Sequence, residues 1–363
     1  MKFEASYQFV LDKIDRIDPS AYARTRNYAD GAITGLSPYI SRGFISTKFV
    51  FDKLQEKGFK PGEMEKLLQE LAWRDYWQQV WKSKGDLINS DLKRTQPDFE
   101  HCQLPSAVLN GETGIEVIDE HIKLLKSTGY IHNHMRMYIA ALACNLGKSH
   151  WRLPAQWMYY HLLDGDWASN ALSWQWVAGS NANKKYYANQ ENINRFFYSN
   201  QVNTFLDVDY SSFENPVLPE ELKKTEVPIL TTELPTAEAL SIHPERPSLI
   251  YNYYNLDPEW HKGEDVNRIL LLEPEVFASH PVSKKCIDFA MGLAECIPGI
   301  QLYVGSVENL MQEYSLKDVF YKEHPLNTSY RGTQEERDWM FTVEGYFPSF
   351  FAFWKKCKKE IGL

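Results

Sequence analysis

The spacing of apolar residues changes along this 363-residue chain, and this change most constrains its fold. In the first two hundred residues, apolar and aromatic side chains recur three and four positions apart, which places them on one face of a helix. Residues 62–83 and 113–130 show this pattern clearly, and residues 134–149 are apolar on most sides, which indicates a central helix. Residues 155–163 and 168–177 continue in the same style. We therefore predict an all-helical first domain over residues 1–205.

The pattern then changes from helical to mixed. Residues 206–246 contain five prolines among polar residues, which predicts an inter-domain linker. Short apolar runs follow and alternate with two helical patterns, at 283–297 and 307–315. The apolar runs are residues 247–255, 268–277, 300–306 and 318–323. This alternation favours a parallel sheet, so residues 247–363 are predicted to form a smaller Rossmann-like α/β domain. No GxGxxG follows any run, so the dinucleotide fingerprint is absent.

Composition limits the cellular setting. No stretch of about 18 apolar residues is present, so we expect no membrane span. The first residues lack the apolar core of a signal peptide, and the five cysteines are scattered without a CxxC pair. These features predict a cytoplasmic protein with reduced thiols and no zinc site. The net charge of −9 argues against a wholly basic surface but leaves room for a local basic groove.

The stretch DGDWASNALSWQW, residues 164–176, combines carboxylates, an amide and three indoles. Asp164 and Asp166 flank Gly165 at the expected start of a helix, where negative charge is favoured. One aspartate can be explained as an N-cap, but both aspartates together with Asn170 cannot. A buried carboxylate needs a partner, and Arg136 is the best candidate.

Two earlier segments also carry unusual polar residues, and each has a simpler alternative. Thr34 and Ser37 precede Pro38 at a plausible helix start, which suits either a phosphate site or an ordinary N-cap. Glu70, Trp73, Arg74 and Trp77 share neighbouring helical faces, as a functional cluster or as a Glu–Arg surface pair beside a packed Trp stripe.

A further segment, residues 129–137, reads GYIHNHMRM. Asn133, Arg136 and Met137 follow one another there at helical spacing. For His132 and His134, a structural role is more common than a ligand-binding one.

Taken in order, these segments resemble the FAD-binding helical domain of the DNA photolyase and cryptochrome family. The resemblance covers roughly residues 20–180 and includes Tyr22, Arg26 and the His-Trp pair at 150–151. Five motifs in family order make it specific. It implies FAD as cofactor and DNA containing pyrimidine dimers as partner.

The resemblance assigns flavin-binding positions. Asp164 resembles the carboxylate that pairs with the arginine beside the flavin ring, and Asp166 resembles the group that faces N3. Asn170 occupies the position next to N5, where an amide can both accept and donate a hydrogen bond. The implied cofactor-binding residues are Tyr22, Thr34, Leu36, Ser37, Arg136, Asp164, Asp166 and Asn170.

The resemblance also assigns electron-transfer and substrate positions. Trp174 and Trp151 match the first two members of the family's tryptophan chain, whereas Asp98 lies near the third position, where no Trp is found. His134 stands where the family usually has Arg, and Arg26 keeps a phosphate-binding identity. The residues that resemble the lining of the lesion pocket, which accepts a flipped dimer, are Glu70, Trp73, Asn133, Met137 and Trp176. The implied catalytic residues are Glu70, Asn170, Trp174 and Trp151.

Two departures from the family stand out. The segment after Trp176 differs from the usual sequence, and the α/β domain follows the helical domain instead of preceding it. We therefore interpret the chain as circularly permuted, with an antenna-like C-terminal domain. The sequence leaves open whether this domain binds a folate, a flavin or nothing.

These observations lead to a ranked set of functions. The leading hypothesis is light-driven repair of cyclobutane pyrimidine dimers by a deoxyribodipyrimidine photo-lyase. The alternative is a cryptochrome-like blue-light photoreceptor with a signalling partner and no repair activity. A redox flavoprotein with a degenerate DNA face comes third.

Overall fold

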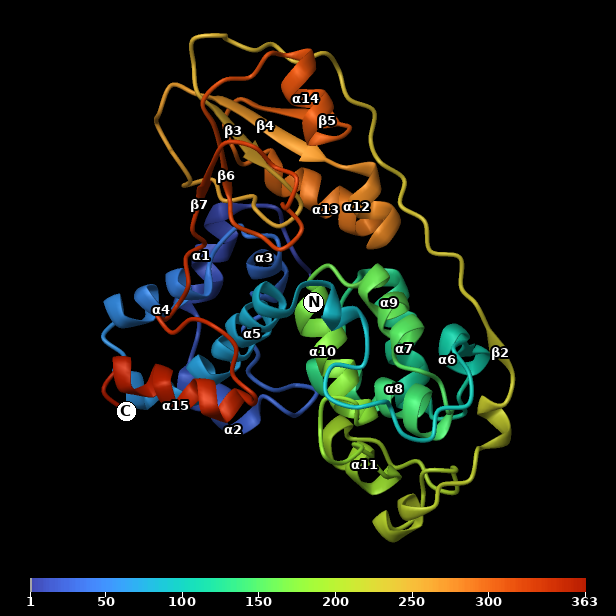
Figure 1. Ribbon diagram of the computed structural model, residues 1–363. Coiled ribbons are helices and arrows are strands. Elements are labelled where there is room, and N and C mark those ends of the chain that lie inside the picture. Colours follow the sequence, from blue (N-terminus) through green and yellow to red (C-terminus); the bar gives the residue numbers. More distant parts are fainter. Residues whose placement is uncertain (1) are drawn as a thin grey trace. The chain divides into compact units, whose positions relative to one another are not determined.

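The computed structural model describes residues 2–363, which divide into two compact units (Figure 1). The first unit consists of the chain up to Pro19, Thr34–Ser83 and Thr231–Leu363. The second consists of Ser20–Ile33 and Lys84–Leu230. The units do not coincide with the predicted domains, because helices from the first hundred residues pack with the C-terminal segment.

The helices of the first unit come from both ends of the chain. From the N-terminal part they are α1 (Tyr7–Asp15), α3 (Ser37–Ser41), α4 (Thr47–Glu56), the 3-10 turn η1 (Pro61–Met64) and α5 (Glu65–Lys84), whose last residue begins the second unit. From the C-terminal part they are α12 (Pro274–Ser279), α13 (Lys284–Ala294), α14 (Val307–Glu313) and α15 (Phe350–Glu360).

The second unit is helical apart from one short antiparallel strand pair, β1 (Leu104–Pro105) with β2 (Thr225–Glu226). Its helices are α2 (Pro19–Thr25), η2 (Gly85–Asn89), α6 (Ser106–Asn110), α7 (Glu116–Thr128), α8 (Asn133–Ala141), η3 (Leu142–Leu146), α9 (Arg152–His161), α10 (Trp167–Ala178), α11 (Gln190–Phe197), η4 (Tyr210–Glu214) and η5 (Glu220–Leu222). All helices expected from the apolar spacing are present.

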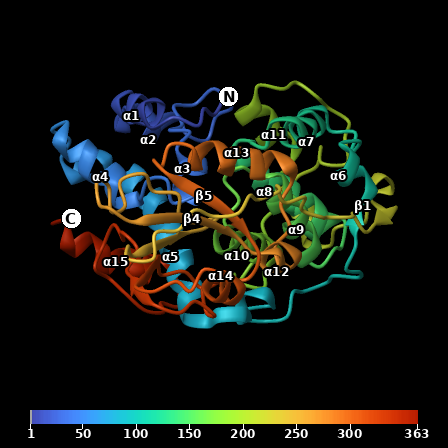
Figure 2. The same ribbon diagram turned by 90° about the horizontal axis from the view of Figure 1, so that it is seen from above.

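A five-stranded parallel sheet forms the α/β part of the first unit, as predicted. The strands lie in the order β5-β4-β3-β6-β7. From β3 the chain adds β4 and then β5 on one side, and it then returns to add β6 and β7 on the other side of β3. The strands are β3 (Ser248–Tyr251), β4 (Asn267–Leu272), β5 (Ile300–Val304), β6 (Val319–Lys322) and β7 (Thr333–Glu335). The short polar β7 and the helix α15 were not predicted. Figure 2 shows α13 and α14 on opposite sides of the sheet.

Alternation along the strands explains why both faces of this sheet are covered. Ile269 and Leu271 of β4 contribute to a buried cluster with Val307 and Leu310 of α14. Leu270 and Leu272, which point to the other face, are buried as well. A sheet that is buried on both faces needs apolar residues throughout its central strands, and β4 provides them.

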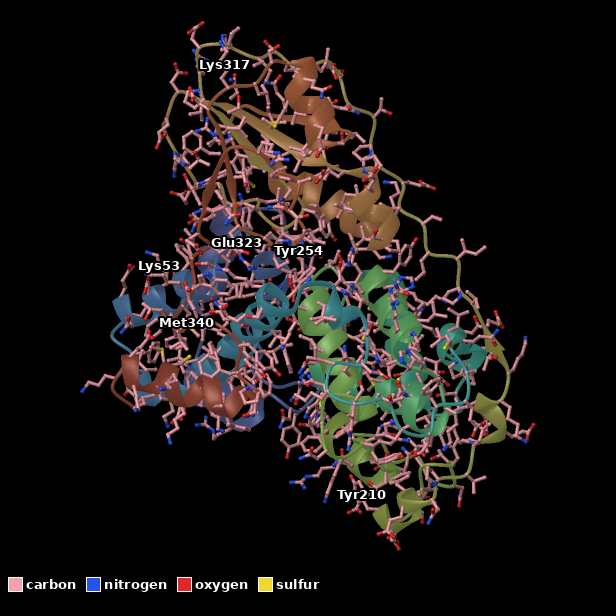
Figure 3. All side chains as sticks on the ribbon, in the orientation of Figure 1. Lys53, Tyr210, Tyr254, Lys317, Glu323 and Met340 are labelled. Carbon is pink, nitrogen blue, oxygen red and sulfur yellow. The ribbon has the colours of Figure 1, made fainter. Side chains whose placement is uncertain are left out.

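The C-terminal segment packs against α5. Phe350 of α15 stacks on Trp73, with ring centroids 3.7 Å apart. Asp75 of α5 is buried and accepts hydrogen bonds from the Thr47 hydroxyl and from the backbone N–H of Met340, a residue that Figure 3 labels. Burial raises the pKa of Asp75 to about 6. These contacts join three distant stretches of sequence into one unit.

The centre of the second unit is α8 with its continuation η3, a π-helical turn. All residues of η3 and most of α8 are buried, as expected from a segment that is apolar on most sides. Helix α7 begins at Glu116 and ends before Gly129, whose left-handed backbone (φ 76°) stops it. Before this helix, the backbone N–H and the hydroxyl of Thr113 both donate to the Asp119 carboxylate.

Among residues 2–363, no helix combines the length and apolar character required to span a membrane.

Candidate functional site

The turn before α10 separates the roles of the two aspartates. Asp166 is the N-cap of α10, and its side chain accepts a hydrogen bond from the N–H of Ser169 at 2.7 Å. Asp164 is buried and pairs with the Arg136 guanidinium at 2.9 Å, as predicted. Gly165 makes the turn tight, since a Cβ there would come within 2.9 Å of the Leu162 carbonyl oxygen. The DGD sequence therefore places a charged pair beside a helix start.

Arg136 is held from several sides. Its Nε and Nη2 donate to the carbonyl oxygen of Ile131, at 3.2 and 3.0 Å, in addition to the bond with Asp164. The Tyr130 ring lies 5.4 Å from the guanidinium carbon. Burial is the main reason that the pKa of Tyr130 rises to about 12, so this side chain stays neutral. The guanidinium is thus fixed by contacts with Ile131, Asp164 and Tyr130.

Asn170 lies one turn into α10 and is buried. Its Nδ2 donates to the Ala155 carbonyl oxygen at 2.8 Å, which ties α10 to α9. Within residues 2–363, no hydrogen bond is described to its Oδ1. The amide therefore keeps an acceptor oxygen and a second N–H for a ligand. It can accept a hydrogen bond from a protonated ring nitrogen or donate one to an unprotonated ring nitrogen.

The tryptophans near α10 differ in exposure. Trp174 is one turn after Asn170 and is buried, whereas Trp176 is 38% exposed. Trp151, which is the N-cap of α9, is completely buried at 0% exposure. The two members of the predicted electron-transfer chain are therefore interior residues.

The end of η2 and the loop that follows it provide acceptors for two indoles, and sequence reasoning missed them. Asn89 accepts a hydrogen bond from the Trp167 indole at 2.7 Å, and Asp91 accepts one from Trp151 at 2.8 Å. Asp91 precedes Trp151 by sixty positions, and no local pattern links them. Only a tertiary contact reveals this pairing.

Helix α8 carries three of the predicted substrate-side residues, Asn133, His134 and Met137. Asn133 is exposed at its first position, and Met137 is partly buried one turn later. His132 is the N-cap, accepts from the N–H of His134, and has its pKa lowered to about 4 mainly by burial. Burial also lowers the pKa of His134, which bonds to the Asn27 carbonyl oxygen at 3.1 Å. Both side chains are therefore neutral near pH 7, and the DNA-side role of His134 stays a prediction.

The other predicted site residues are divided between the units. Tyr22 of α2 and Arg26, directly after it, belong to the second unit and are partly buried. The first unit contains Thr34, Leu36, Ser37, Glu70 and Trp73.

Contacts in the first unit bear on the two simpler alternatives, the N-cap at Thr34 and Ser37 and the surface pair of Glu70 with Arg74. Thr34 accepts a hydrogen bond from the N–H of Leu36, and Leu36 is the N-cap of α3 without a side-chain cap. Arg74 donates to the Ser41 hydroxyl at 2.7 Å. Phosphate binding by this segment stays a prediction.

The segment after Trp176 is bound to the second unit by two cations. Arg94 donates to the carbonyl oxygen of Gly179 at 2.7 Å, and Lys185 pairs with Asp98 at 3.0 Å. The Tyr186 ring lies 5.8 Å from that of Trp176. Two positive charges that could face DNA are therefore engaged within the protein.

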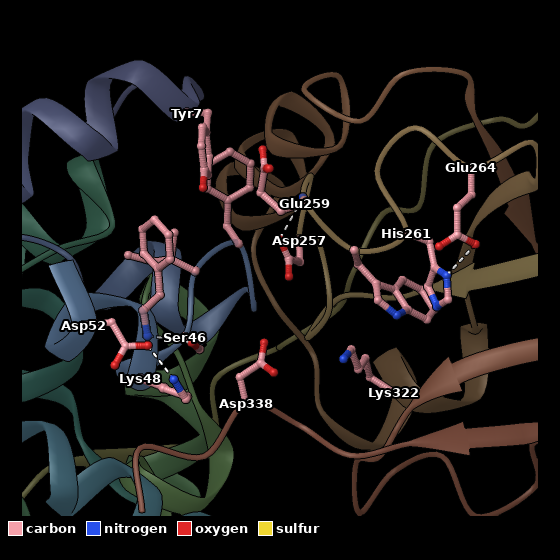
Figure 4. A pocket seen from close by; sticks show the side chains of 14 residues that line it. Tyr7, Ser46, Lys48, Asp52, Asp257, Glu259, His261, Glu264, Lys322 and Asp338 are labelled. Atoms are coloured by element: carbon pink, nitrogen blue, oxygen red, sulfur yellow. Dashed lines mark hydrogen bonds and ion pairs between the residues drawn. The ribbon is translucent and has the colours of Figure 1, made fainter. Parts of the chain in front are cut away.

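The first unit contains a cavity of about 520 Å³ at the carboxyl ends of β3, β6 and β7 (Figure 4). Asp257, whose pKa is raised to about 6 by burial and by the nearby Asp338 carboxylate, faces it. Lys48 pairs with Asp52 within it, and His261 lies between Glu264 and Glu335 at 2.8 Å from each. Its lining is Tyr7, Phe44, Ile45, Ser46, Lys48, Phe49, Asp52, Asp257, Glu259, Trp260, His261, Glu264, Lys322 and Asp338.

The charges of this cavity bear on the antenna expectation. Carboxylates predominate, and its cations already face carboxylates of the protein. A phosphate or glutamate tail would meet like charge there. The predicted folate or flavin antenna therefore gains no support from this cavity.

Comparison with known proteins matches the helical segment. Residues 67–210 match the family model described as the FAD binding domain of DNA photolyase. Over this segment the chain is thus similar to the DNA photolyase and cryptochrome family.

Similar proteins carry both names of the family. The chain is 32% identical over 163 residues to a deoxyribodipyrimidine photo-lyase of Streptomyces griseus, covering 43% of this chain and 34% of that protein. It is 30% identical over 171 residues to a cryptochrome DASH of Gloeobacter violaceus, covering 44% and 33%. A solved Synechocystis cryptochrome aligns with a TM-score of 0.48 and 24% identity over 54% of this chain and 44% of that one. The chain thus spans about a third of the length of these curated relatives.

Proposed function

We propose that this protein binds FAD and uses blue or near-UV light to repair cyclobutane pyrimidine dimers in DNA. The observation that carries the proposal is the arrangement around α10. The buried Asp164 with its partly buried partner Arg136, and an amide with an unused acceptor, Asn170, lie within the segment that matches the FAD-binding family model. These residues fit a flavin, which needs both a charged partner and an adaptable amide beside its ring.

The chain's own residues have distinct tasks in this proposal. Reduced FAD supplies the electron that splits the cyclobutane ring after excitation. Asn170 serves the flavin N5 position, and Trp174 and Trp151 supply electrons to the cofactor. Glu70 holds the dimer by a hydrogen bond, and Arg26 contacts a DNA phosphate. The remaining lesion contacts are assigned to Trp73, Asn133, Met137 and Trp176, and the remaining flavin contacts to Tyr22, Thr34, Leu36, Ser37 and Asp166.

A second candidate function is a blue-light photoreceptor that binds FAD without repairing DNA. Specific observations favour it. His134, which replaces the usual Arg, is neutral, and both Arg94 and Lys185 are engaged internally. The similarity to a cryptochrome DASH is nearly as strong as that to a photo-lyase. In this reading a signalling partner replaces DNA.

A repair assay separates the two functions. Purified protein with bound, reduced FAD is incubated with a thymine-dimer oligonucleotide under blue light and in the dark, and the remaining dimers are quantified by chromatography. We expect light-dependent loss of the dimer, with DNA binding that weakens as salt rises. Retention of the dimer, with FAD bound and reduced, contradicts repair and leaves the photoreceptor function ahead.

A matched pair of variants on α5 tests the substrate contact. Glu70→Gln removes a charged hydrogen bond to the dimer, so the repair rate should fall about 10-fold to 100-fold while the FAD content stays unchanged. Glu65→Gln, whose side chain pairs with Lys358, is the control and should repair at the rate of the unaltered protein. Equal loss in both variants argues against the Glu70 assignment.

The permuted domain order, an antenna chromophore and a cytoplasmic location stay predictions. Extraction of chromophores from purified protein, followed by their separation, tests the antenna directly. Recovery of FAD alone argues against a folate antenna.

A further inference from the structure

We propose that Asp91 accepts the indole proton of Trp151 when this tryptophan gives up an electron, an inference that rests on the proposed function. It concerns the end of the electron-transfer chain, where the sequence offers no third tryptophan. The contacts around Trp151 suit this residue to be the last member of the electron-transfer chain.

The Trp151 indole is shielded from water but not from a base. Its side chain is 0% exposed, so its N–H cannot lose a proton directly to solvent. The Nε1–H donates to Asp91 Oδ1 at 2.8 Å. Asp91 is 17% exposed, so a proton that reaches its carboxylate can continue to water. Asp91 is therefore the described link between this buried indole and solvent.

The geometry of Asp91 is set by its other contacts. Its Oδ2 accepts a hydrogen bond from the N–H of Gln96 at 2.8 Å. Gln96 Oε1 in turn accepts one from the backbone N–H of Trp151 at 2.8 Å. The loop and the indole are thus joined twice, which keeps the carboxylate aligned with the indole N–H.

His150 contributes a second donor. Its Nδ1 accepts from the N–H of Arg152 at 3.4 Å, which leaves Nε2 as the ring nitrogen that carries a proton. That Nε2 lies 3.3 Å from Asp91 Oδ1 and faces it as a donor. His150 therefore supports the carboxylate and does not compete with it for the Trp151 proton.

The proposed step is balanced in charge and atoms. One electron passes from Trp151 to oxidised Trp174, which has itself been oxidised in reducing the bound cofactor. The N–H bond of Trp151 breaks, the proton bonds to Asp91 Oδ1, and a neutral indolyl radical remains. An external thiol later returns the electron, and the proton returns from Asp91 or water. Removing the positive charge matters because an unpaired charge in the interior is costly.

Transient absorption of the full-length protein with oxidised FAD tests this step. After a light pulse, the cationic tryptophan radical should convert to the neutral form, more slowly in D2O than in H2O. Asp91→Asn keeps the side-chain shape but is a far weaker base. In this variant the conversion should slow about tenfold or more, and recombination should reduce the yield of long-lived radical.

Two further variants make the result specific. Asp86→Asn removes an exposed carboxylate from the neighbouring turn η2 and should behave like the unaltered protein. Asp91→Glu restores a carboxylate and should recover part of the rate. A conversion rate that is unchanged in Asp91→Asn, or that shows no D2O effect in the unaltered protein, overturns the inference alone. A protein with bound FAD that forms no tryptophan radical overturns the electron chain of the proposed function as well.

Discussion

The buried pair of Arg136 and Asp164 shows how one contact at the scale of single residues can organise a site. Asp164 is only 3% exposed, so its charge depends on the guanidinium 2.9 Å away. Buried pairs add little net stability when formed, yet breaking one leaves an uncompensated charge. The pair is therefore better understood as a device for placing charge at the start of α10 than as a source of stability.

Arg136→Gln should destabilise the FAD-free protein by about 3 to 5 kcal/mol, because Asp164 keeps a buried charge without its ion-pair partner. Urea unfolding measures the change. The double variant with Asp164→Asn should recover a large part of the loss. Arg152→Gln, on an exposed position of α9, is the control and should change stability little. A single variant as stable as the control would show that the pair is not energetically coupled.

His132 gives a prediction about pH. Its folded pKa of about 4 lies below the ordinary value of 6.5, chiefly because of burial, so the unfolded chain binds the proton more tightly. The stabilising contribution is complete above pH 6.5 and is lost as the pH falls towards 4. His132→Asn keeps an N-cap side chain but cannot titrate.

Unfolding free energies measured between pH 6.5 and 4 should therefore fall less in His132→Asn, by roughly 2 to 3 kcal/mol over this interval. His243→Asn alters an exposed histidine and serves as the control. Parallel pH profiles for all three proteins would contradict a proton-excluding role of His132.

At the scale of elements, the end of α7 shows how a turn and a packing contact combine. Gly129 has φ 76°, and a Cβ there would lie 2.7 Å from Leu163 Cγ. Gly114, before the same helix, has φ 78° with nothing within 4 Å of its missing Cβ. The two glycines share a left-handed backbone conformation and differ in how close their neighbours lie.

Gly114→Ala should cost about 1 kcal/mol, the conformational penalty alone. Gly129→Ala should cost about 1 to 3 kcal/mol more, because Leu163 must also move. Chemical denaturation of both variants gives the difference. An equal loss of unfolding free energy in both variants would show that Leu163, in the loop before α10, moves aside without cost.

At the scale of the whole molecule, the five cysteines report on burial in both units. All are free, and Cys144, Cys286 and Cys357 are buried, whereas Cys102 is exposed. Burial raises the pKa of Cys144, Cys286 and Cys357, which keeps these thiols protonated and slow to react.

A maleimide at neutral pH should therefore label Cys102 first, with partly exposed Cys296 following and the other three reacting only after denaturation. Mass spectrometry of the native and denatured protein measures the sites. Cys102→Ser should remove the fast phase. Rapid native labelling of Cys144 would contradict the burial of η3.

The sequence by itself determined the elements and the chemistry of the α10 segment. Apolar periodicity predicts the long helices and the four longer strands, because each buries one stripe or face against a neighbour. The Asp164–Arg136 pair was predictable because a buried carboxylate requires a cation. The polar β7 and the helix α15 were not, since tertiary contacts decide these local choices.

Only the tertiary structure decided which distant segments form a unit and which side chains support the site. The packing of α15 on α5 divides the predicted helical domain between two units. The hydrogen bond from Trp151 to Asp91 crosses sixty residues. Local periodicity reports that a side chain is buried but not against what, because the partner is chosen by shape and hydrogen bonding after the chain has folded.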